Sequence, residues 1–255
     1  ARRDFPRIPE FHAEYAEHLA RQMKFPEAIA AMEEAFRAYA EHEEDGEAME
    51  FDDAMLAVAK ERADLWKKIT EREKTLRISA CAIVRDEAHD MPRWLENTAV
   101  YSDERIVVDT GSKDDTKALA EAAGARVYDY MWRDDFAAAK NEALSRAAGD
   151  WVAFLDADEY FAEPQRVRPY LAALSVEQPE IEAVMLTIAN LDEDDHFKEI
   201  QRFPTVRLFR RRADIAFAGR IHEAVGKKEG QLEIKLERNL CLQVGGFTST
   251  ARRGQ

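Results

Sequence analysis

The hydrophobic positions of this 255-residue chain follow two periods, and the change between them falls at about residue 75. Before that point, apolar residues recur three and four positions apart in a sequence rich in Ala, Glu, Lys and Arg, which is typical of amphipathic helices. Residues 10–40 predict two helices separated by a turn at Phe25-Pro26, and residues 51–74 predict a third. The acidic residues 41–50 are expected to connect the second helix to the third.

The spacing of the first two helices resembles one tetratricopeptide repeat of about 34 residues. A plain helical hairpin with no binding role explains the same pattern equally well. We therefore expect residues 1–74 to form an all-α region that either binds a protein or packs against the remainder of the chain.

After residue 75, short apolar runs of the kind that form strands buried on both faces alternate with helical patterns. This order predicts an α/β fold with a mostly parallel sheet flanked by helices. The expected strands are residues 76–84, 105–109, 126–130 and 151–156, and the expected helices are residues 92–100, 114–123 and 135–148. Beyond about residue 163, strand-like residues 183–188, 205–209 and 233–242 predict α+β structure that covers the carboxyl edge of the sheet.

Composition narrows the possible classes of function. The chain has 37 Lys and Arg against 51 Asp and Glu, a formal net charge of −14, which repels a nucleic-acid backbone. No apolar stretch approaches the roughly 18–20 residues that cross a bilayer. Cys81 and Cys241 are too few for a disulfide framework and wrongly spaced for zinc. We expect a soluble, cytoplasmic protein.

Two aspartates follow a buried strand in the segment Asp156-Ala157-Asp158. In an extended chain, residues i and i+2 point the same way, so the two carboxylates would face one spot and repel each other. A divalent cation removes this conflict, and hard oxygen ligands suit Mg²⁺ or Mn²⁺. A surface loop is the plain alternative, but the adjoining Glu159 favours a metal site.

A second strand ends in Asp109-Thr110-Gly111-Ser112. In the structural interpretation, Ser112 caps the following helix and Asp115 completes a capping box. The strand end and the Gly111 turn also lie where a nucleotide base and ribose bind in α/β sheets. Neither the three spaced glycines of a dinucleotide site nor a Gly-Lys-Ser/Thr phosphate loop is present, so NAD and ATP chemistry are not supported.

Other polar residues have roles that the pattern alone leaves open. Asp135 and Lys140 lie in a loop that enters a helix, where a capped and solvated helix face is the plain interpretation. Arg207 lies near a strand end, either on a solvated edge strand or in a site for an anionic ligand. His222 and Glu223 adjoin in a loop, where His222 is a candidate metal ligand and Glu223 a candidate general base.

Five motifs in order make residues 77–225 resemble a family 2 glycosyltransferase with the GT-A fold. Three positions differ from the family pattern: Asp86 replaces Asn, Ala137 replaces Ser, and Lys140 replaces Arg. The motifs are Ile83-Val84-Arg85-Asp86-Glu87; Val108-Asp109-Thr110-Gly111-Ser112 with Asp115-Thr116; Trp132 and Asp135-Phe136 with Lys140-Asn141; Leu155-Asp156-Ala157-Asp158-Glu159; and Arg207-Leu208-Phe209-Arg210 followed by Gly219-Arg220-Ile221-His222-Glu223.

The resemblance implies an inverting transfer from a nucleotide sugar, usually a UDP sugar, with Mg²⁺ or Mn²⁺ on the diphosphate. It implies Asp156, Asp158 and His222 as metal ligands. Glu223 is implied as the base that deprotonates the acceptor, with Glu159 as the second candidate. The implied nucleotide-sugar contacts are Arg85, Glu87, Asp109, Gly111, Ser112, Asp135, Lys140, Asn141, Asp156, Ala157 and Arg207.

The same resemblance sets the expected domain organisation. Residues 1–74 form the helical region, and residues 75–255 form the glycosyltransferase domain, divided into a nucleotide-binding half, 75–162, and an acceptor-side half, 163–255. Because relatives often carry helical repeats beside the catalytic domain, the acceptor is expected to be a peptide or protein. We expect no nucleic-acid partner.

Two departures motivate an alternative function. Relatives often carry a late His-x-Gly-Tyr element, whereas this chain has Val244-Gly245-Gly246-Phe247, and Lys140 supplies a point charge where an Arg would bind in a bidentate manner. The chain would then be a catalytically weak or inactive binding module that holds a partner through its helices. A phosphatase with an Asp-x-Asp nucleophile is disfavoured, because such a motif follows the first strand and here it follows the fourth.

Overall fold

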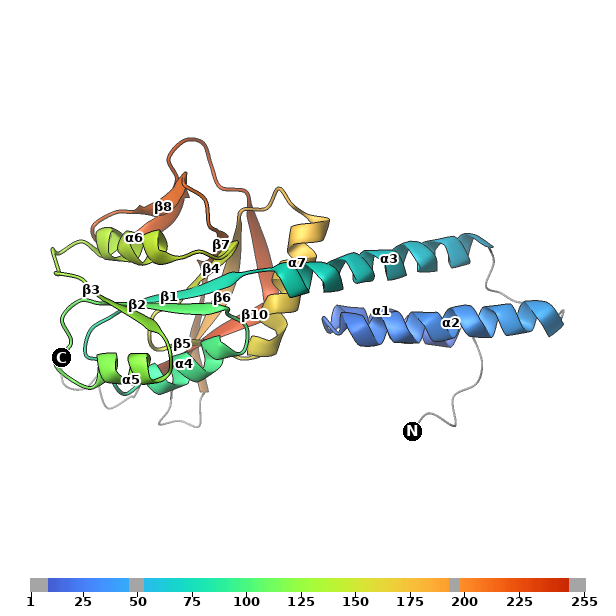
Figure 1. The fold of residues 1–255 in the computed structure, drawn as a ribbon, viewed down its shortest axis with the longest axis horizontal. Helices are drawn as coiled ribbons and strands as arrows, with labels where there is room; N and C mark the ends of the chain where they lie inside the picture. Colours follow the sequence, from blue (N-terminus) through green and yellow to red (C-terminus); the bar gives the residue numbers. More distant parts are fainter. Residues whose placement is uncertain (1–8, 46–52, 193–197, 248–255) are drawn as a thin grey trace. The chain divides into compact units, whose positions relative to one another are not determined.

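The computed structural model describes residues 9–45, 53–192 and 198–247 (Figure 1). The described residues divide into two compact units. One unit contains the residues up to Thr75 together with Pro169–Glu177, and the other contains the remaining residues. None of the helices in the described ranges combines the length and the apolarity needed to span a membrane.

Three helices form the N-terminal part of the first unit: α1 (Pro9–Arg21), α2 (Phe25–Asp45) and α3 (Asp53–Thr75). Their buried residues recur at helical spacing, as Ala16, Leu19 and Ala20 do in α1. The prediction of three helices is confirmed. The expected connector is wrong in part, because residues 41–45 continue α2, consistent with the good helix propensity of Glu. Residues 46–50 of that connector lie outside the described residues.

The second unit contains an eight-stranded sheet with the order β3-β2-β1-β4-β7-β6-β10-β5. Strands β1, β2, β3 and β4 are mutually parallel, β7 is antiparallel to both β4 and β6, and β10 is parallel to β6 and antiparallel to β5. Their bounds are β1 (Ile78–Val84), β2 (Glu104–Asp109), β3 (Arg126–Asp129), β4 (Trp151–Phe154), β5 (Glu159–Phe161), β6 (Ala183–Asp192), β7 (Lys198–Arg210) and β10 (Ile234–Phe247).

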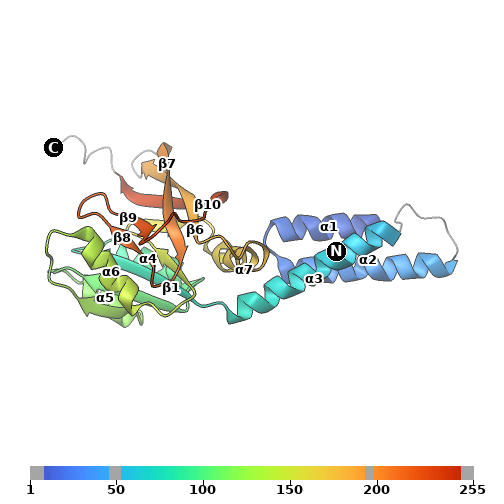
Figure 2. The same cartoon turned by 90° about the horizontal axis from the view of Figure 1, so that it is seen from above.

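A separate two-stranded sheet pairs β8 (Ile215–Ala218) with β9 (Ala224–Lys227) in antiparallel fashion (Figure 2). Only this hairpin stands apart from the main sheet in the described part of the chain. The sequence predicted that the second half would cover the sheet edge, whereas β5, β6, β7 and β10 extend the sheet itself. Strands β1, β2, β3 and β4 thus build one half of a single sheet, and β5 joins the later strands in the other half.

Helices flank the parallel strands. Helices α4 (Met91–Ala99) and α5 (Thr116–Ala122) lie on one face, and α6 (Phe136–Arg146) lies on the other (Figure 1). Helix α7 (Val167–Glu177), preceded by a short 3₁₀ turn at Pro164–Arg166, was not predicted. The expected α/β fold class, with a mostly parallel sheet, flanking helices and an N-terminal all-α region, is confirmed.

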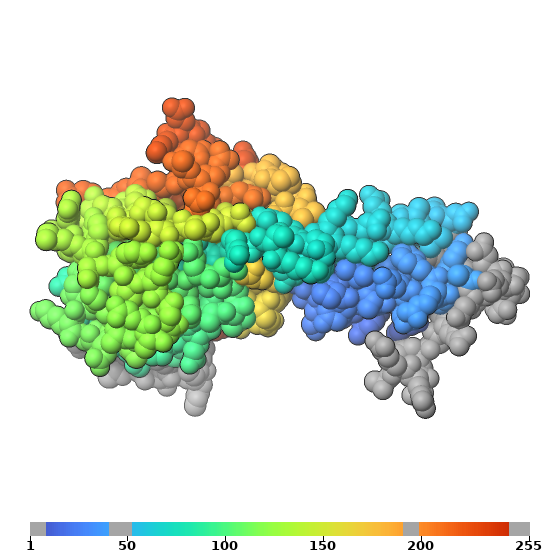
Figure 3. All heavy atoms as spheres, in the orientation of Figure 1, coloured from blue at the N-terminus to red at the C-terminus, as the bar shows by residue number. Residues whose placement is uncertain are grey.

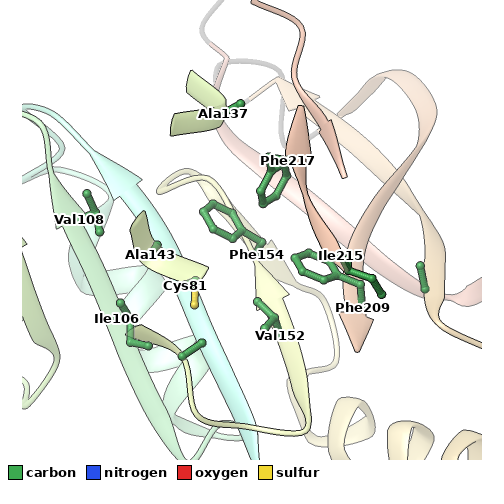
Figure 4. Packing of buried hydrophobic residues seen from close by; sticks show 12 residues of the cluster. Cys81, Ile106, Val108, Ala137, Ala143, Val152, Phe154, Phe209, Ile215 and Phe217 are labelled. Carbon is green, nitrogen blue, oxygen red and sulfur yellow. The ribbon is translucent and has the colours of Figure 1, made fainter. Parts of the chain in front are cut away.

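One buried cluster of the sheet unit lies between the sheet and α6. Phe154 of β4, Phe209 of β7 and Phe217 of β8 meet edge to face, with ring centroids 4.9 Å apart for Phe154 and Phe217. Figure 4 shows these rings turned toward one another near Ala137 in the first turn of α6. Burying side chains of this size stabilises the fold by about 1.5–3 kcal/mol each. The aromatic cluster therefore packs the separate hairpin against the main sheet.

Candidate functional site

The carboxyl ends of the parallel strands meet at one edge of the sheet. Val84 at the end of β1 lies beside Asp109 at the end of β2, and β4 ends next to them in the sheet order. The loops that follow these strands carry most of the predicted site residues. The structure therefore brings the predicted nucleotide segment and the Asp156-Ala157-Asp158 segment to the same edge, where ligands of such sheets bind.

Asp109 organises the loop after β2. Its Oδ1 accepts hydrogen bonds from the backbone N–H groups of Gly111 and Ser112, at 2.8 and 2.9 Å. Gly111 has φ +116°, a conformation that a residue with a side chain adopts only under strain. Asp109 is 2% exposed, and its Oδ2 has no hydrogen-bond partner within the described ranges. A buried acceptor is thus left available at the strand end.

The predicted capping box is wrong. Helix α5 begins at Thr116, with Asp115 as its N-cap residue and no capping bond from that side chain. The hydroxyl of Ser112 lies too early in the chain for this role and accepts instead from the backbone N–H of Asp86, at 2.9 Å. Asp114 supplies a hydrogen-bond acceptor for the start of the helix, because its Oδ1 accepts from the backbone N–H of Thr116 at 3.0 Å.

The loop after β1 is tied to the same turn. Asp86 has φ 56°, and its Oδ1 accepts from the backbone N–H of Lys113 at 2.6 Å. The backbone N–H of Glu87 donates to Thr116 Oγ1 at 2.8 Å. Burial, followed by the charges of Asp90 and Asp114, raises the pKa of Glu87. Arg85 is exposed beside this loop.

The Asp156-Ala157-Asp158 segment is a turn and not an extended strand. Strand β4 ends at Phe154, and the backbone N–H of Glu159 donates to the carbonyl of Asp156 at 3.0 Å. The expected i, i+2 alignment of the two carboxylates is therefore wrong. The two aspartates remain close enough to interact, since the charge of Asp156 contributes to raising the pKa of Asp158.

Asp156 is held between two cations. Its Oδ1 lies 3.3 Å from Lys140 Nζ, and its Oδ2 lies 2.9 Å from Arg207 Nη2. Arg207 also grips Glu159 with two hydrogen bonds of 2.7 Å. Lys140 reaches Glu223 Oε1 at 2.7 Å. We call Lys140, Asp156, Glu159, Arg207 and Glu223 the charge cluster.

Lys140 is buried and Arg207 is largely buried, so two plain interpretations from the sequence are wrong. Lys140 is 3% exposed because its ammonium points inward, 5.3 and 5.4 Å from the ring centroids of Phe154 and Phe217. It does not lie on a solvated helix face. The Arg207 side chain is 16% exposed because β7 lies between β4 and β6, not at the edge of the sheet.

The acidic groups around the turn differ in protonation behaviour. Burial opposes the charged form of Asp156, but Arg207 and Lys140 outweigh it and keep its pKa below the usual range. Burial raises the pKa of Glu159, with Arg207 opposing and Asp156 adding to the rise. Burial, then the charges of Glu159 and Asp156, raises the pKa of Asp158 to about 7. Asp158 makes no ion pair in the part of the chain that the structure describes, and only a backbone hydrogen bond opposes the rise.

Two residues of this turn have the chemistry of ligands for one divalent cation. The carboxylate of Asp158, partly buried among acidic groups, is the kind of oxygen ligand that Mg²⁺ and Mn²⁺ prefer, and Asp156 adjoins it. Within the described ranges, no group of three or more His, Cys, Asp or Glu side chains is arranged to hold a metal ion. His222 is exposed in the β8–β9 loop with φ 57°, and no described contact brings it to either aspartate. Its role as a ligand stays a prediction.

Helix α6 positions the remaining predicted residues. Asp135 caps the helix by accepting from the backbone N–H of Ala138 at 2.9 Å. Asn141 does not face the loops, because its Nδ2 donates to the carbonyl of Phe217 and its Oδ1 accepts from the N–H of Phe217, both at 2.9 Å. Ala157 is buried in the turn. The roles of these residues toward a donor stay predictions.

Sequence reasoning missed one structural residue near the site. Asn97 of α4 donates to the carbonyl of Phe161 at 2.9 Å and accepts from its N–H at 3.0 Å. This pair fixes β5, the strand that begins with Glu159. Nothing in the helical pattern of residues 92–100 marks an asparagine whose partner lies 64 residues away.

A comparison with models of known protein families shows the family of this chain. A family model described as glycosyl transferase family 2 matches residues 79–238, more than half of the 255 residues. A TPR repeat-containing protein of Synechococcus elongatus is 40% identical over 148 residues, 58% of this chain and 35% of that protein. The SPbeta prophage-derived glycosyltransferase SunS of Bacillus subtilis is 24% identical over 179 residues, 69% of this chain and 41% of that protein. This chain thus spans well under half the length of both relatives.

Solved structures show a weaker likeness. Glucosyl-3-phosphoglycerate synthase from Mycobacterium tuberculosis, in complex with Mg²⁺ and uridine diphosphate, is 24% identical with a TM-score of 0.39 and covers 50% of this chain and 48% of that chain. Mannosyl-3-phosphoglycerate synthase from Rubrobacter xylanophilus is 26% identical with a TM-score of 0.41, covering 49% of this chain and 45% of that chain.

Proposed function

Since the chain belongs to glycosyl transferase family 2, we propose that it moves a sugar from a nucleotide sugar to an acceptor, with inversion at the anomeric carbon and with help from Mg²⁺ or Mn²⁺. The observation that carries this proposal is the charge cluster. In it, one buried lysine contacts both Asp156, beside the predicted diphosphate site, and Glu223, the predicted base. Residues from two distant parts of the sequence thereby meet where the donor and the acceptor would react.

The loop after β2 is the proposed nucleobase site. The buried Oδ2 of Asp109 has no partner in the described part of the chain, and it would accept a hydrogen bond from the N–H of a base such as uracil. The bond would compensate a buried acceptor whose lack of a partner is costly. Gly111 has no side chain that could block the ribose. The space beside it is open, since no atom lies within 4 Å of the position that a Cβ would take. These features support a uridine nucleotide.

The diphosphate would lie between the turn after β4 and the two buried cations. Lys140 and Arg207 supply positive charge beside Asp156, and Asp156 and Asp158 would hold the divalent cation. That cation, when bound, would stabilise the charge that develops on the leaving diphosphate. Lys140 offers a point charge and not the fork of an arginine, so its contact with phosphate is less directional.

Glu223 is the proposed general base. It would take the proton of the acceptor hydroxyl while that oxygen bonds to the anomeric carbon, and the bond from this carbon to the diphosphate oxygen breaks on the opposite face. Glu159 is a poorer candidate, because Arg207 and the backbone N–H of Asp156 occupy its oxygens. The exposed fractions of the side chains, 15% for Glu223 and 4% for Glu159, support the same order.

The acceptor is proposed to be a peptide or protein that the helical unit engages. A groove of about 730 Å³ in this unit is lined by α1 and α3, with Met32 of α2 among its lining residues. Apolar side chains such as Met55 and Val58 lie beside charged ones such as Glu17 and Arg62. This mixture of apolar and charged lining suits a polypeptide segment.

A second candidate function is a binding module with weak or no turnover. The observation in its favour is that Lys140 and Arg207 already occupy both carboxylate oxygens of Asp156. Those cations compete with a metal ion for the same ligand. The module would then bind a nucleotide sugar without transferring the sugar efficiently.

One experiment separates the two functions. The protein is mixed with Mn²⁺ and UDP-glucose, UDP-N-acetylglucosamine or GDP-mannose, and both thermal stability and release of the nucleoside diphosphate are measured. A ligand at 100 times its Kd should stabilise the fold by about 2.7 kcal/mol. A transferase shows stabilisation and slow donor hydrolysis that Asp158→Asn and removal of the metal both abolish. Stabilisation without hydrolysis supports the binding module, and a folded protein with neither response refutes both.

A further inference from the structure

The hairpin β8–β9 carries the proposed base but is not part of the main sheet. Glu223 lies in the loop of residues 219–223 that joins Ile215–Ala218 to Ala224–Lys227. The hairpin strands pair with each other, and the order of the eight-stranded sheet does not include them. Hydrogen bonds of the main sheet therefore do not fix the position of Glu223 relative to Asp156. Contacts with α6, together with the packing of Phe217 on Phe154 and Phe209, do so.

Asn141 makes two of these contacts. Its carboxamide forms two hydrogen bonds with one peptide unit, donating to the carbonyl of Phe217 and accepting from its N–H, both at 2.9 Å. A carboxamide has one donor group and one acceptor side by side, as this arrangement requires. Asn141 therefore pairs with the edge of β8 as a neighbouring strand would.

Helix α6 and the loop before it hold the chain from Phe217 to Glu223 at two further points. The backbone N–H of Phe136 donates to the carbonyl of Arg220 at 3.1 Å, and the Arg220 guanidinium donates to the carbonyl of Asp134 at 3.3 Å. At the end of the loop, Glu223 pairs with Lys140 at 2.7 Å. The space-filling view shows the segments that carry α6 and β8 in direct contact (Figure 3).

We propose that Asn141 is a positioning residue that holds Glu223 in place for proton abstraction, a role that rests on the proposed transfer reaction. The sequence motif placed Asn141 among the donor contacts, whereas both of its polar atoms are bonded to the backbone of Phe217. Weakening this clamp allows β8, and with it Glu223, to shift relative to the donor. Misplacement of a reacting group by about 1 Å can cost about 100-fold in rate.

The test uses Asn141→Asp. This variant keeps the size of the side chain and an acceptor for the N–H of Phe217, but it loses the donor and places a carboxylate oxygen against the carbonyl of Phe217. Hydrolysis of UDP-glucose, or of whichever of the three donors the wild type hydrolyses fastest, is measured with Mn²⁺ and water as the acceptor. Water loses its proton to Glu223 as its oxygen bonds to the anomeric carbon, and the nucleoside diphosphate departs with the electrons of the broken bond.

The expected results separate positioning from donor binding. In Asn141→Asp, kcat falls about 10- to 100-fold, while the Kd for UDP with Mn²⁺, measured by calorimetry, changes less than about twofold. Glu223→Gln lowers kcat by about 100-fold or more. In the Glu223→Gln background, Asn141→Asp lowers kcat less than about twofold further, because the side chain that it positions can no longer take the proton.

Ser79→Ala is the matched control for a purely structural loss. Ser79 Oγ also makes two hydrogen bonds, to Glu104 Oε1 at 2.5 Å and from the backbone N–H of Gly149 at 2.9 Å. It lies near the start of β1, at the end of the sheet opposite to Asp156. This variant should lose stability and keep kcat. If Asn141→Asp does not fold, Arg220→Ala is used instead. It removes the hydrogen bond from the exposed Arg220 side chain to the carbonyl of Asp134, which holds the same loop, and it should also lower kcat.

Several outcomes would overturn the assignment. A tenfold or greater loss of UDP affinity in Asn141→Asp would make Asn141 a donor contact. An equal fall of kcat in Ser79→Ala, or a full further loss in the Glu223→Gln background, would make its role a general structural one. An unchanged kcat in Asn141→Asp, with an active wild type, refutes the positioning role alone. A wild type that neither binds UDP nor hydrolyses any donor refutes the proposed function and the positioning role with it.

Discussion

Replacing Lys140 by methionine tests the charge cluster most directly. Lys140→Met removes the ammonium and keeps an unbranched apolar side chain between the rings of Phe154 and Phe217, so little space is left empty. Asp156 loses one partner and keeps Arg207 at 2.9 Å. Glu223 loses its partner at 2.7 Å and has no other ion pair among the residues that the structure describes. The variant therefore leaves one largely buried carboxylate unpaired.

The magnitude follows from the burial of each pair. The side chains of Lys140 and Glu223 are 4% and 15% exposed, and breaking a buried ion pair by removing one partner costs about 3–5 kcal/mol. The Asp156 side chain is 42% exposed, where an ion pair contributes about 0–1 kcal/mol. Because Glu223 is not fully buried, we expect a total loss of about 3 kcal/mol. For a unit of this size, that loss lowers the Tm by roughly 6–12 °C.

The assay is urea and thermal unfolding at pH 7.5, without donor or metal. The double variant Lys140→Met/Glu223→Gln should regain about 2 kcal/mol, because it no longer contains an unpaired buried carboxylate. Lys117→Met, which breaks an exposed ion pair with Asp129, is the matched control and should leave the unfolding midpoint unchanged. A Lys140→Met variant as stable as the wild type, or one that Glu223→Gln fails to rescue, would show that the cluster is not a coupled network.

Three further predictions concern other parts of the sheet unit. Gly149→Ala puts a Cβ 2.7 Å from Ser79 Oγ and 2.8 Å from Ser79 N, so it should cost about 2 kcal/mol in urea denaturation; Gly226→Ala, which has no atom within 4 Å, should stay within about 0.5 kcal/mol. Asp109→Asn replaces the unpaired acceptor by a donor and should weaken UDP binding at least about tenfold in calorimetry, with the fold intact; unchanged affinity would exclude Asp109 from the nucleobase site. In metal-free protein, the raised pKa of Asp158, about 7 against 3.8, makes stability fall as pH rises from 4 to 7, since the unfolded chain has already released this proton; Asp158→Asn should remove that decline, and parallel Tm–pH curves would contradict it.

The parallel half of the sheet was predictable because its strands and helices each show their own period. The buried strand Ile78–Val84 and the helix Met91–Ala99 differ from the predicted ranges by one or two residues. Strands β5 and β8 have three and four residues, too short for a periodic signal. Strand β7 begins at Lys198, well before the predicted residue 205. This stretch was missed because residues 199–204 are exposed and mix apolar with polar positions, so they lack the apolar run that marks a buried strand.

The place of several candidate residues in the fold was predictable, but the partners of their side chains were not. The strand pattern placed Asp109 and Asp156 at one edge of the sheet, because the carboxyl ends of parallel strands meet there, and only motif order added Glu223. Spacing along the chain says nothing about which side chains pair across it. The burial of Lys140 and the bonds of Asn141 to Phe217 depend on the packing of α6 against a hairpin more than 70 residues later.

The charges of the site provide an independent reason for a divalent cation. Asp156, Asp158, Glu159 and Glu223 contribute four negative charges when ionised, against two positive charges from Lys140 and Arg207, which leaves −2. A nucleoside diphosphate sugar adds about two more negative charges and would be repelled. Below about pH 7, protonation of Asp158 removes one of the two excess negative charges of the site. Above that pH Asp158 is ionised, and an added cation is needed to reduce the negative charge. Donor binding without metal should therefore be weak and should weaken further as pH rises, whereas binding with Mn²⁺ should not.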